Sequence, residues 1–100
     1  MTRVEVLEAA ISIGESEDRK TKYGKPENSF QKIADFWNAY LRGQKRECEI
    51  TDVDVGVMMG LMKIARISTG VQQDDSFVDA VNYLALASDL IETKANTVNS

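Results

Sequence analysis

Two cations and two acids at helical spacing are the residues of this sequence best suited to phosphate or metal chemistry. Lys63 and Arg66 lie three positions apart, and Asp75 and Asp79 lie four apart, so each pair projects from one side of a helix. Lysine and arginine bind phosphate oxygens, and carboxylates are ligands that magnesium prefers. The sequence therefore predicts a site where the cations hold phosphates and the acids hold a divalent metal.

A short turn separates these two pairs along the chain. Folding the helix that carries the two acids back at Gly70–Gln73 places Asp79 near the level of Arg66, with Asn82 and Tyr83 one turn further along. The same cluster also has a structural interpretation, in which a buried salt bridge fixes the register of the hairpin. Both interpretations remain open from the sequence.

A second candidate site precedes the second predicted helix. Arg19, Lys22, Tyr23, Gly24 and Asn28 surround a turn that leads into a helix N-terminus. Such an N-terminus attracts anions, and adjacent cations strengthen that attraction. The alternative is ordinary helix capping, with the tyrosine packed across the turn.

Four segments with apolar residues at helical spacing must position these side chains. They span residues 2–22, 28–41, 51–69 and 74–94. Thr2 with Glu5 and Thr51 with Asp54 are predicted capping boxes, and Gly14 allows a break in the first helix. We expect an all-α fold of about four helices around a central antiparallel hairpin of the third and fourth. Residues 1–94 would form one helical domain, and 95–100 a frayed polar tail.

The first two helices are expected to cover the last two only in part. Val4, Leu7 and Ile11, with Ile13 as a further candidate, form the predicted packing side of the first helix, whereas the third and fourth helices are apolar nearly all round. Two shorter amphipathic helices cannot cover every side of such a hairpin. The sequence therefore predicts a homo-oligomer, most simply a dimer.

Composition excludes several classes of protein. The chain has a net charge of −4, no histidine and one cysteine, Cys48, expected to be half-buried in a loop. Zinc sites and thiol catalysis therefore lack their usual ligands and base. Acids flank the short basic stretches, which disfavours nucleic acid as a partner. Because no apolar run approaches the ~20 residues that span a bilayer, we expect a cytoplasmic protein without membrane partners.

Two stretches of the sequence together form a distinctive pattern. The first is Arg19-x3-Tyr23-Gly24-x3-Asn28-x-Phe30-x2-Ile33-Ala34-x2-Trp37-x2-Tyr40-Leu41. The second is Asp54-Val55-x2-Met58-Met59-x-Leu61-x-Lys63-Ile64-Ala65-Arg66, followed by Asp75-Ser76-x2-Asp79-x3-Tyr83. The pattern resembles a family of small phage and prophage all-α proteins of unassigned function. The resemblance covers most of the chain and implies no particular activity.

More distantly, the last segment is similar to MazG-like nucleoside triphosphate pyrophosphohydrolases and to nucleotide-modification-associated phage domains. Those enzymes hold magnesium against a triphosphate with the motifs E-x-x-E and E-x-x-D. Asp75-Ser76-Phe77-Val78-Asp79 resembles the second motif with altered spacing. The first motif has no counterpart, because Asp54-Val55-Gly56-Val57 lacks the second acid. The resemblance implies a MazG-like bundle, a nucleotide ligand and Mg²⁺.

Three functional hypotheses follow. The leading one is a phage-type, MazG-like domain that binds a nucleotide or a nucleotide-derived small molecule, with metal-dependent hydrolysis left open. Its predicted nucleotide contacts are Lys63, Arg66, Asn82, Tyr83, Arg19 and Tyr23, and its metal ligands are Asp75 and Asp79. The alternative is a non-enzymatic phage accessory or anti-defence protein that binds a host protein or sequesters its ligand. The third is a purely structural oligomer.

Overall fold

The computed structural model of the chain describes residues 1–15, 26–69 and 74–99. These ranges form the helices α1 (Arg3–Gly14), α3 (Pro26–Gly43), α4 (Asp52–Ser68) and α5 (Asp74–Asn99), without a strand. The all-α prediction is thereby confirmed. No helix within these ranges combines the length and the apolar character needed to cross a membrane.

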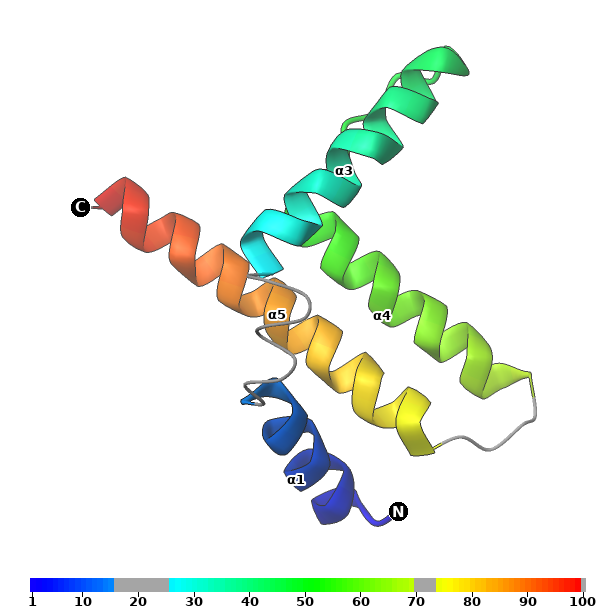
Figure 1. Cartoon of the computed structure of the whole chain (residues 1–100), viewed down its shortest axis with the longest axis vertical. Helices are drawn as coiled ribbons and strands as arrows, with labels where there is room; N and C mark the ends of the chain where they lie inside the picture. Colours follow the sequence, from blue (N-terminus) through cyan, green and yellow to red (C-terminus); the bar gives the residue numbers. More distant parts are fainter. Residues whose placement is uncertain (16–25, 70–73, 100) are drawn as a thin grey trace.

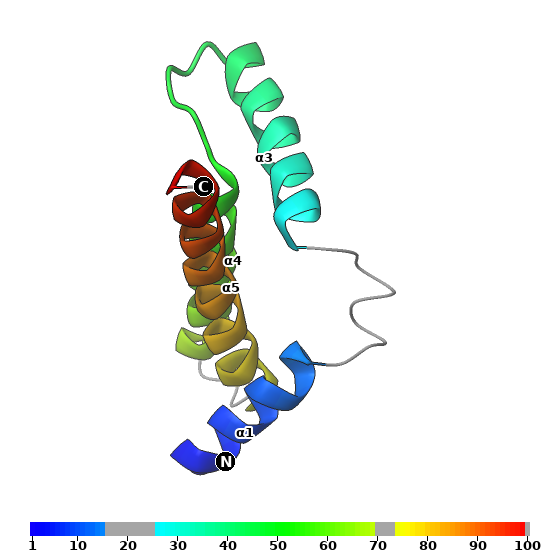
Figure 2. The same ribbon diagram turned by 90° about the vertical axis from the view of Figure 1, so that its left-hand side faces the viewer.

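The centre of the fold is the antiparallel hairpin of α4 and α5, which share the most extensive contact in the molecule (Figure 1). This hairpin joins the third and fourth predicted helices, so the predicted arrangement is confirmed. Helix α1 packs on α5, and α3 packs on α4. Figure 2 shows that α1 and α3 both lie on the same side of the hairpin. None of the four described helices lies over the opposite side of the hairpin.

Local capping explains where two of the helices begin. Thr51 Oγ1 accepts a hydrogen bond from the Asp54 amide at 3.2 Å, and the Asp54 carboxylate accepts one from the Thr51 amide at 3.0 Å. Thr2 and Glu5 form the same reciprocal pair before α1. Both predicted capping boxes are confirmed, and each satisfies amide groups that a helix N-terminus leaves without partners.

Two helix ends differ from the sequence prediction. Helix α1 ends at Gly14, and most of the remainder of the predicted segment 2–22 lies outside the described residues. Helix α5 continues to Asn99, past the predicted end at Lys94. Residues 95–99 have little tendency to start a helix, but they can extend one that packing already stabilises. The sequence pattern alone therefore placed the end of this helix earlier.

Small residues let α4 and α5 approach closely. A Cβ at Gly56 would lie 3.0 Å from the Ala87 Cβ and 3.3 Å from the Phe30 ring. Phe30 and Ala34 of α3 pack beside this contact with Val55 and Leu90, which are all buried. The core therefore lies where α3 crosses the N-terminal half of α4 and the C-terminal half of α5.

The packing side predicted for α1 is wrong at three of its four positions. Val4, Leu7 and Ile11 are 55%, 49% and 61% exposed, whereas Ile13 is half-buried. The buried residue of this helix is Ala10. Apolar residues surround α1 on several sides, so their spacing does not determine which side meets α5.

Candidate functional site

The predicted polar cluster contains one ion pair across the hairpin. Lys63 Nζ of α4 lies 3.0 Å from Asp79 Oδ2 of α5, and the two side chains are 13% and 21% exposed. The predicted partner at this level was Arg66, one turn away. Residues that pair across an antiparallel hairpin lie equally far from its turn along the chain. Residues 63 and 79 are each eight positions from residue 71, so the acid meets Lys63 and not Arg66.

The other two charged members of the predicted cluster are solvent-facing. Arg66 and Asp75 are both exposed, and no ion pair joins Arg66 to an acid of the described residues. Nor do the described side chains include a group of three or more acids or other ligands able to hold a metal ion. Asp79 already has Lys63 as its partner. The magnesium site at Asp75 and Asp79 therefore stays a prediction.

Asn82 and Tyr83, the two predicted nucleotide contacts on α5, face different helices. Tyr83 is half-buried and packs against the ring of Phe30 in α3, with 6.3 Å between the ring centroids. Asn82 faces α1, where a Cβ at Gly14 would lie 3.4 Å from its Oδ1. Consecutive helical residues point about 100° apart, which separates the two side chains. They do not line one common site.

Asn82 has an unusual environment. Its Nδ2 is buried and has no hydrogen-bond partner among the described residues. A buried amide donor without a partner costs about 1–3 kcal/mol, so such groups need an explanation. Of the remaining predicted contacts, Arg19 and Tyr23 lie outside the described residues.

Two polar features that sequence analysis missed stabilise the fold. Asn38, only 5% exposed, donates from Nδ2 to the Ile50 carbonyl and accepts from the Ile50 amide, both at 2.8 Å. Asp52, 4% exposed, pairs with Lys94 and accepts from the Val53 amide at 2.8 Å. The sequence signal for a buried Asn38 was its position four residues after the core residue Ala34, on the same side of the helix. Nothing in the sequence indicated the pairing of Asp52 with Lys94, which are far apart in the chain.

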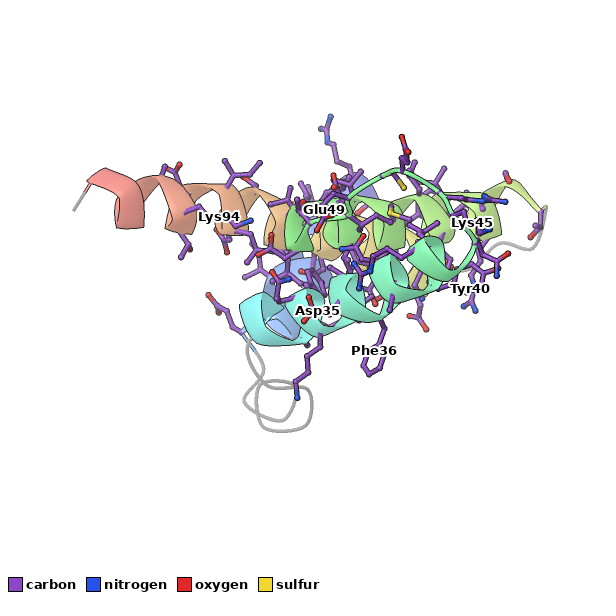
Figure 3. The ribbon with its side chains drawn as sticks, turned by 90° about the horizontal axis from the view of Figure 1, so that it is seen from above. Asp35, Phe36, Tyr40, Lys45, Glu49 and Lys94 are labelled. Atoms are coloured by element: carbon purple, nitrogen blue, oxygen red, sulfur yellow. The ribbon has the colours of Figure 1, made fainter. Side chains whose placement is uncertain are left out.

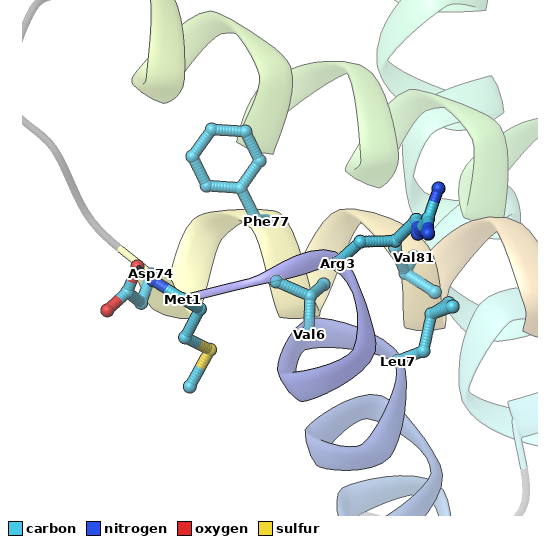
Figure 4. A pocket seen from close by; sticks show the side chains of 7 residues that line it. All are labelled: Met1, Arg3, Val6, Leu7, Asp74, Phe77 and Val81. Carbon is cyan, nitrogen blue, oxygen red and sulfur yellow. Dashed lines mark hydrogen bonds and ion pairs between the residues drawn. The ribbon is translucent and has the colours of Figure 1, made fainter.

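A shallow hollow of about 390 Å³ lies between the beginnings of α1 and α5 (Figure 4). It is lined by Met1, Arg3, Val6, Leu7, Asp74, Phe77 and Val81. The amine of Met1 lies 3.2 Å from Asp74 Oδ1, so the charge of that acid is partly compensated. The lining is mostly apolar and provides neither paired carboxylates nor clustered cations for phosphate chemistry.

Large apolar side chains are exposed on every helix of the described residues. The two most exposed are Phe36 and Tyr40 on α3, at 76% and 67%. Phe36 points away from the hairpin, as Figure 3 shows. Cys48 is also exposed, contrary to the half-buried position expected for it. The most prominent surface features of the molecule are therefore apolar side chains rather than a polar cleft.

Comparison with known proteins gives a family but no activity. The family described as domain of unknown function (DUF6378) matches residues 5–91. The Gene 55 protein of Mycobacterium phage D29 is 41% identical over 66 residues, which are 66% of this chain and 40% of that protein. The Gene 55 protein of Mycobacterium phage L5 is 40% identical over 65 residues, 65% of this chain and 39% of that protein.

The chain thus spans about two-fifths of the length of these phage relatives. No solved structure matches the chain. The predicted resemblance to a phage protein family of unassigned function is confirmed, whereas the more distant similarity to MazG-like enzymes stays a prediction. The chain belongs to the DUF6378 family, and its relatives include proteins of mycobacteriophages.

Proposed function

We propose that this chain is a non-enzymatic phage accessory domain that binds another protein through the outer side of α3. The observation that carries the proposal is the exposure of Phe36 and Tyr40, at 76% and 67%. The two rings are four residues apart, so they project from the same side of the helix. Aromatic residues are enriched in protein interfaces and among the residues that contribute most to binding energy.

The surroundings of these rings also suit a protein interface. Lys32 lies one turn before Phe36 and is exposed. Asp35, which is exposed as well, accepts a hydrogen bond from Gln31 at 3.0 Å. An apolar centre with charged neighbours of both signs is the usual composition of a transient interface. Binding a protein here would cover the rings and leave the charges at the rim.

The polar cluster supports a non-enzymatic role. Lys63 and Asp79 neutralise each other, Asp74 and Asp75 follow one another in the first turn of α5, and the described residues contain no group of three or more possible metal ligands. A hydrolytic site of the MazG type needs several carboxylates around its metal. The alternative hypothesis from the sequence therefore accounts for more of the observed surface than the enzymatic one.

Affinity capture from a lysate of the host cell tests this proposal. The wild-type chain is compared with a Phe36→Ser/Tyr40→Ser variant and with a matched Lys45→Ser/Glu49→Ser control in the exposed loop after α3. We expect one protein to be retained by the wild type and the control and lost by the variant without aromatic rings. Binding is then measured with that purified protein. Equal retention by all three chains would contradict the proposal, as would retention that requires a nucleotide.

A nucleotide-derived ligand is the second candidate function, and Asn82 is the observation that favours it. Its buried Nδ2 lacks an acceptor among the described residues, on the side of α5 that faces α1. A ligand that supplies an acceptor between α1 and α5 would satisfy this donor. Magnesium is not required for such binding.

Thermal unfolding with ribo-, deoxyribo- and cyclic nucleotides, with and without magnesium, tests the second candidate. A ligand at a hundred times its dissociation constant adds about 2.7 kcal/mol, which shifts the midpoint by about 11–22 °C for a domain of this size. A selective shift that disappears in Asn82→Ala would support a nucleotide site. A flat panel would eliminate it.

A further inference from the structure

The side of α4 that faces away from α3 is apolar and uncovered. Gly56 and Gly60 face α5, because a Cβ at either would contact α5 side chains. Val55, which precedes Gly56, is fully buried and packs with Phe30 of α3. Val57 follows Gly56 and is 38% exposed. Since successive residues point about 100° apart, Val55 and Val57 lie on opposite sides of the contact with α5.

The corresponding side of α5 is uncovered as well. A Cβ at Gly56 would contact Ala87, which therefore faces α4. Tyr83 packs against Phe30 on the side that α3 covers. A Cβ at Gly60 would contact the Leu84 side chain, which lies on the side of α5 away from Tyr83 and is 47% exposed. Figure 2 agrees, since α1 and α3 leave this side of the hairpin bare.

Regular spacing joins these positions into one surface, which we call the uncovered hairpin face. It consists of Val57, Leu61 and Ile64 on α4 and Leu84 and Ile91 on α5, each 38–56% exposed. The α4 residues repeat at intervals of four and three, and the two α5 residues are seven apart, so each set stays on one side of its helix. Ser68 and Ser88 continue these spacings, and so does the exposed Asp54 at the start of α4.

The solvent-accessible area of this single chain is larger than expected for a compact monomer of its mass. The chain exposes 7446 Å². A monomeric protein of 11.1 kDa is expected to expose about 5,650 Å². The excess, about 1,800 Å² over all residues, is more than the roughly 800 Å² that each partner buries in a stable interface. The radius of gyration, 15.1 Å, likewise exceeds the roughly 13 Å of a compact chain of this length.

We infer that a second copy of this chain packs against the uncovered hairpin face, so that two hairpins form a four-helix bundle about a two-fold axis. Each copy contributes the same surface, as a two-fold interface requires. The interior of the bundle would then contain apolar residues at the spacings that antiparallel helix bundles use. This inference goes beyond the proposed function, because the outer side of α3 points away from this face and stays free in the dimer.

The area available supports a second copy as the occupant. The five members of the uncovered hairpin face are apolar, and the exposed Asp54 lies at its edge, at the start of α4. Two copies can therefore meet through the apolar members with this acid at the rim of the interface.

Sedimentation equilibrium of the purified chain at micromolar concentrations tests the inference. We expect the wild type to have twice the 11.1 kDa mass of one chain. Leu61→Arg and, separately, Ile91→Arg should each sediment as a monomer, because two copies would have to bury opposed cations. Both residues are 56% exposed within one chain, so the substitutions leave its own core intact. Far-UV circular dichroism checks that each variant keeps its helices.

The matched control is Ile11→Arg on α1, where the replaced residue is 61% exposed but lies off the uncovered hairpin face. It should remain a dimer, and so should Phe36→Ser/Tyr40→Ser, which keeps this result separate from the test of the proposed function. A monomeric wild type would overturn the inference and assign the face to another occupant. A dimer that survives in both Leu61→Arg and Ile91→Arg would also overturn it.

Discussion

The ion pair between Lys63 and Asp79 can be tested as a structural element by a double-mutant cycle. Asp79→Leu leaves the Lys63 ammonium, 13% exposed, without its carboxylate at 3.0 Å. Removing one partner of a fully buried pair costs about 3–5 kcal/mol. The slight exposure of both side chains lets water compensate in part, so we expect a loss of about 2–3 kcal/mol in the free energy of unfolding. For a domain of this size that loss lowers the unfolding midpoint by about 10 °C or more.

The double variant Lys63→Met/Asp79→Leu completes the cycle. Replacing both charges by apolar side chains of similar size removes the desolvation penalty together with the attraction, so the double variant should unfold within about 1 kcal/mol of the wild type. Urea unfolding at one fixed protein concentration measures all four chains. The reasoning is refuted if Asp79→Leu is as stable as the wild type, or if the double variant loses the sum of both single losses.

Two further predictions concern packing and hydrogen bonding. Gly60→Ala should stabilise the chain by about 1 kcal/mol through helix propensity, since its Cβ would make ordinary contacts with the Leu84 side chain at 3.4 Å and the Ala80 carbonyl oxygen at 3.9 Å. Gly56→Ala, whose Cβ would lie 3.0 Å from Ala87, should instead be less stable than Gly60→Ala by about 1–3 kcal/mol in urea unfolding, and equal stabilities would contradict the packing argument. Asn38→Ala removes both 2.8 Å bonds to the Ile50 backbone and should destabilise by about 2–3 kcal/mol, with faster hydrogen exchange of that amide; an unchanged exchange rate would show that the bonds do not hold the loop.

The helices and their hairpin were predictable because local rules determine them. Thr51 with Asp54 marked the start of α4, and the apolar character of the last two helices marked them as the central pair. The packing side of α1 was not predictable in this way. Its apolar residues lie on several sides, so only contact with α5 decides that Ala10 is buried and Ile11 exposed.

The candidate site was predictable in its residues but not in its partners. Lys63 and Asp79 were expected in one cluster and do meet there, yet the pairing depends on the register of the hairpin, which a count across residues 70–73 fixed only to within a turn. Pairs such as Asp52 with Lys94 join positions far apart in the chain. Such pairs follow from the tertiary arrangement, and no local spacing indicates them.

We propose that the outer side of α3, and not the polar cluster, carries the function. The most direct measurement compares partner capture by Phe36→Ser/Tyr40→Ser with capture by Lys63→Met/Asp79→Leu, using the wild type as reference. We predict that loss of the two exposed rings abolishes binding and that replacing the ion pair leaves it unchanged. Binding that survives without the rings but disappears with the ion pair would contradict the account.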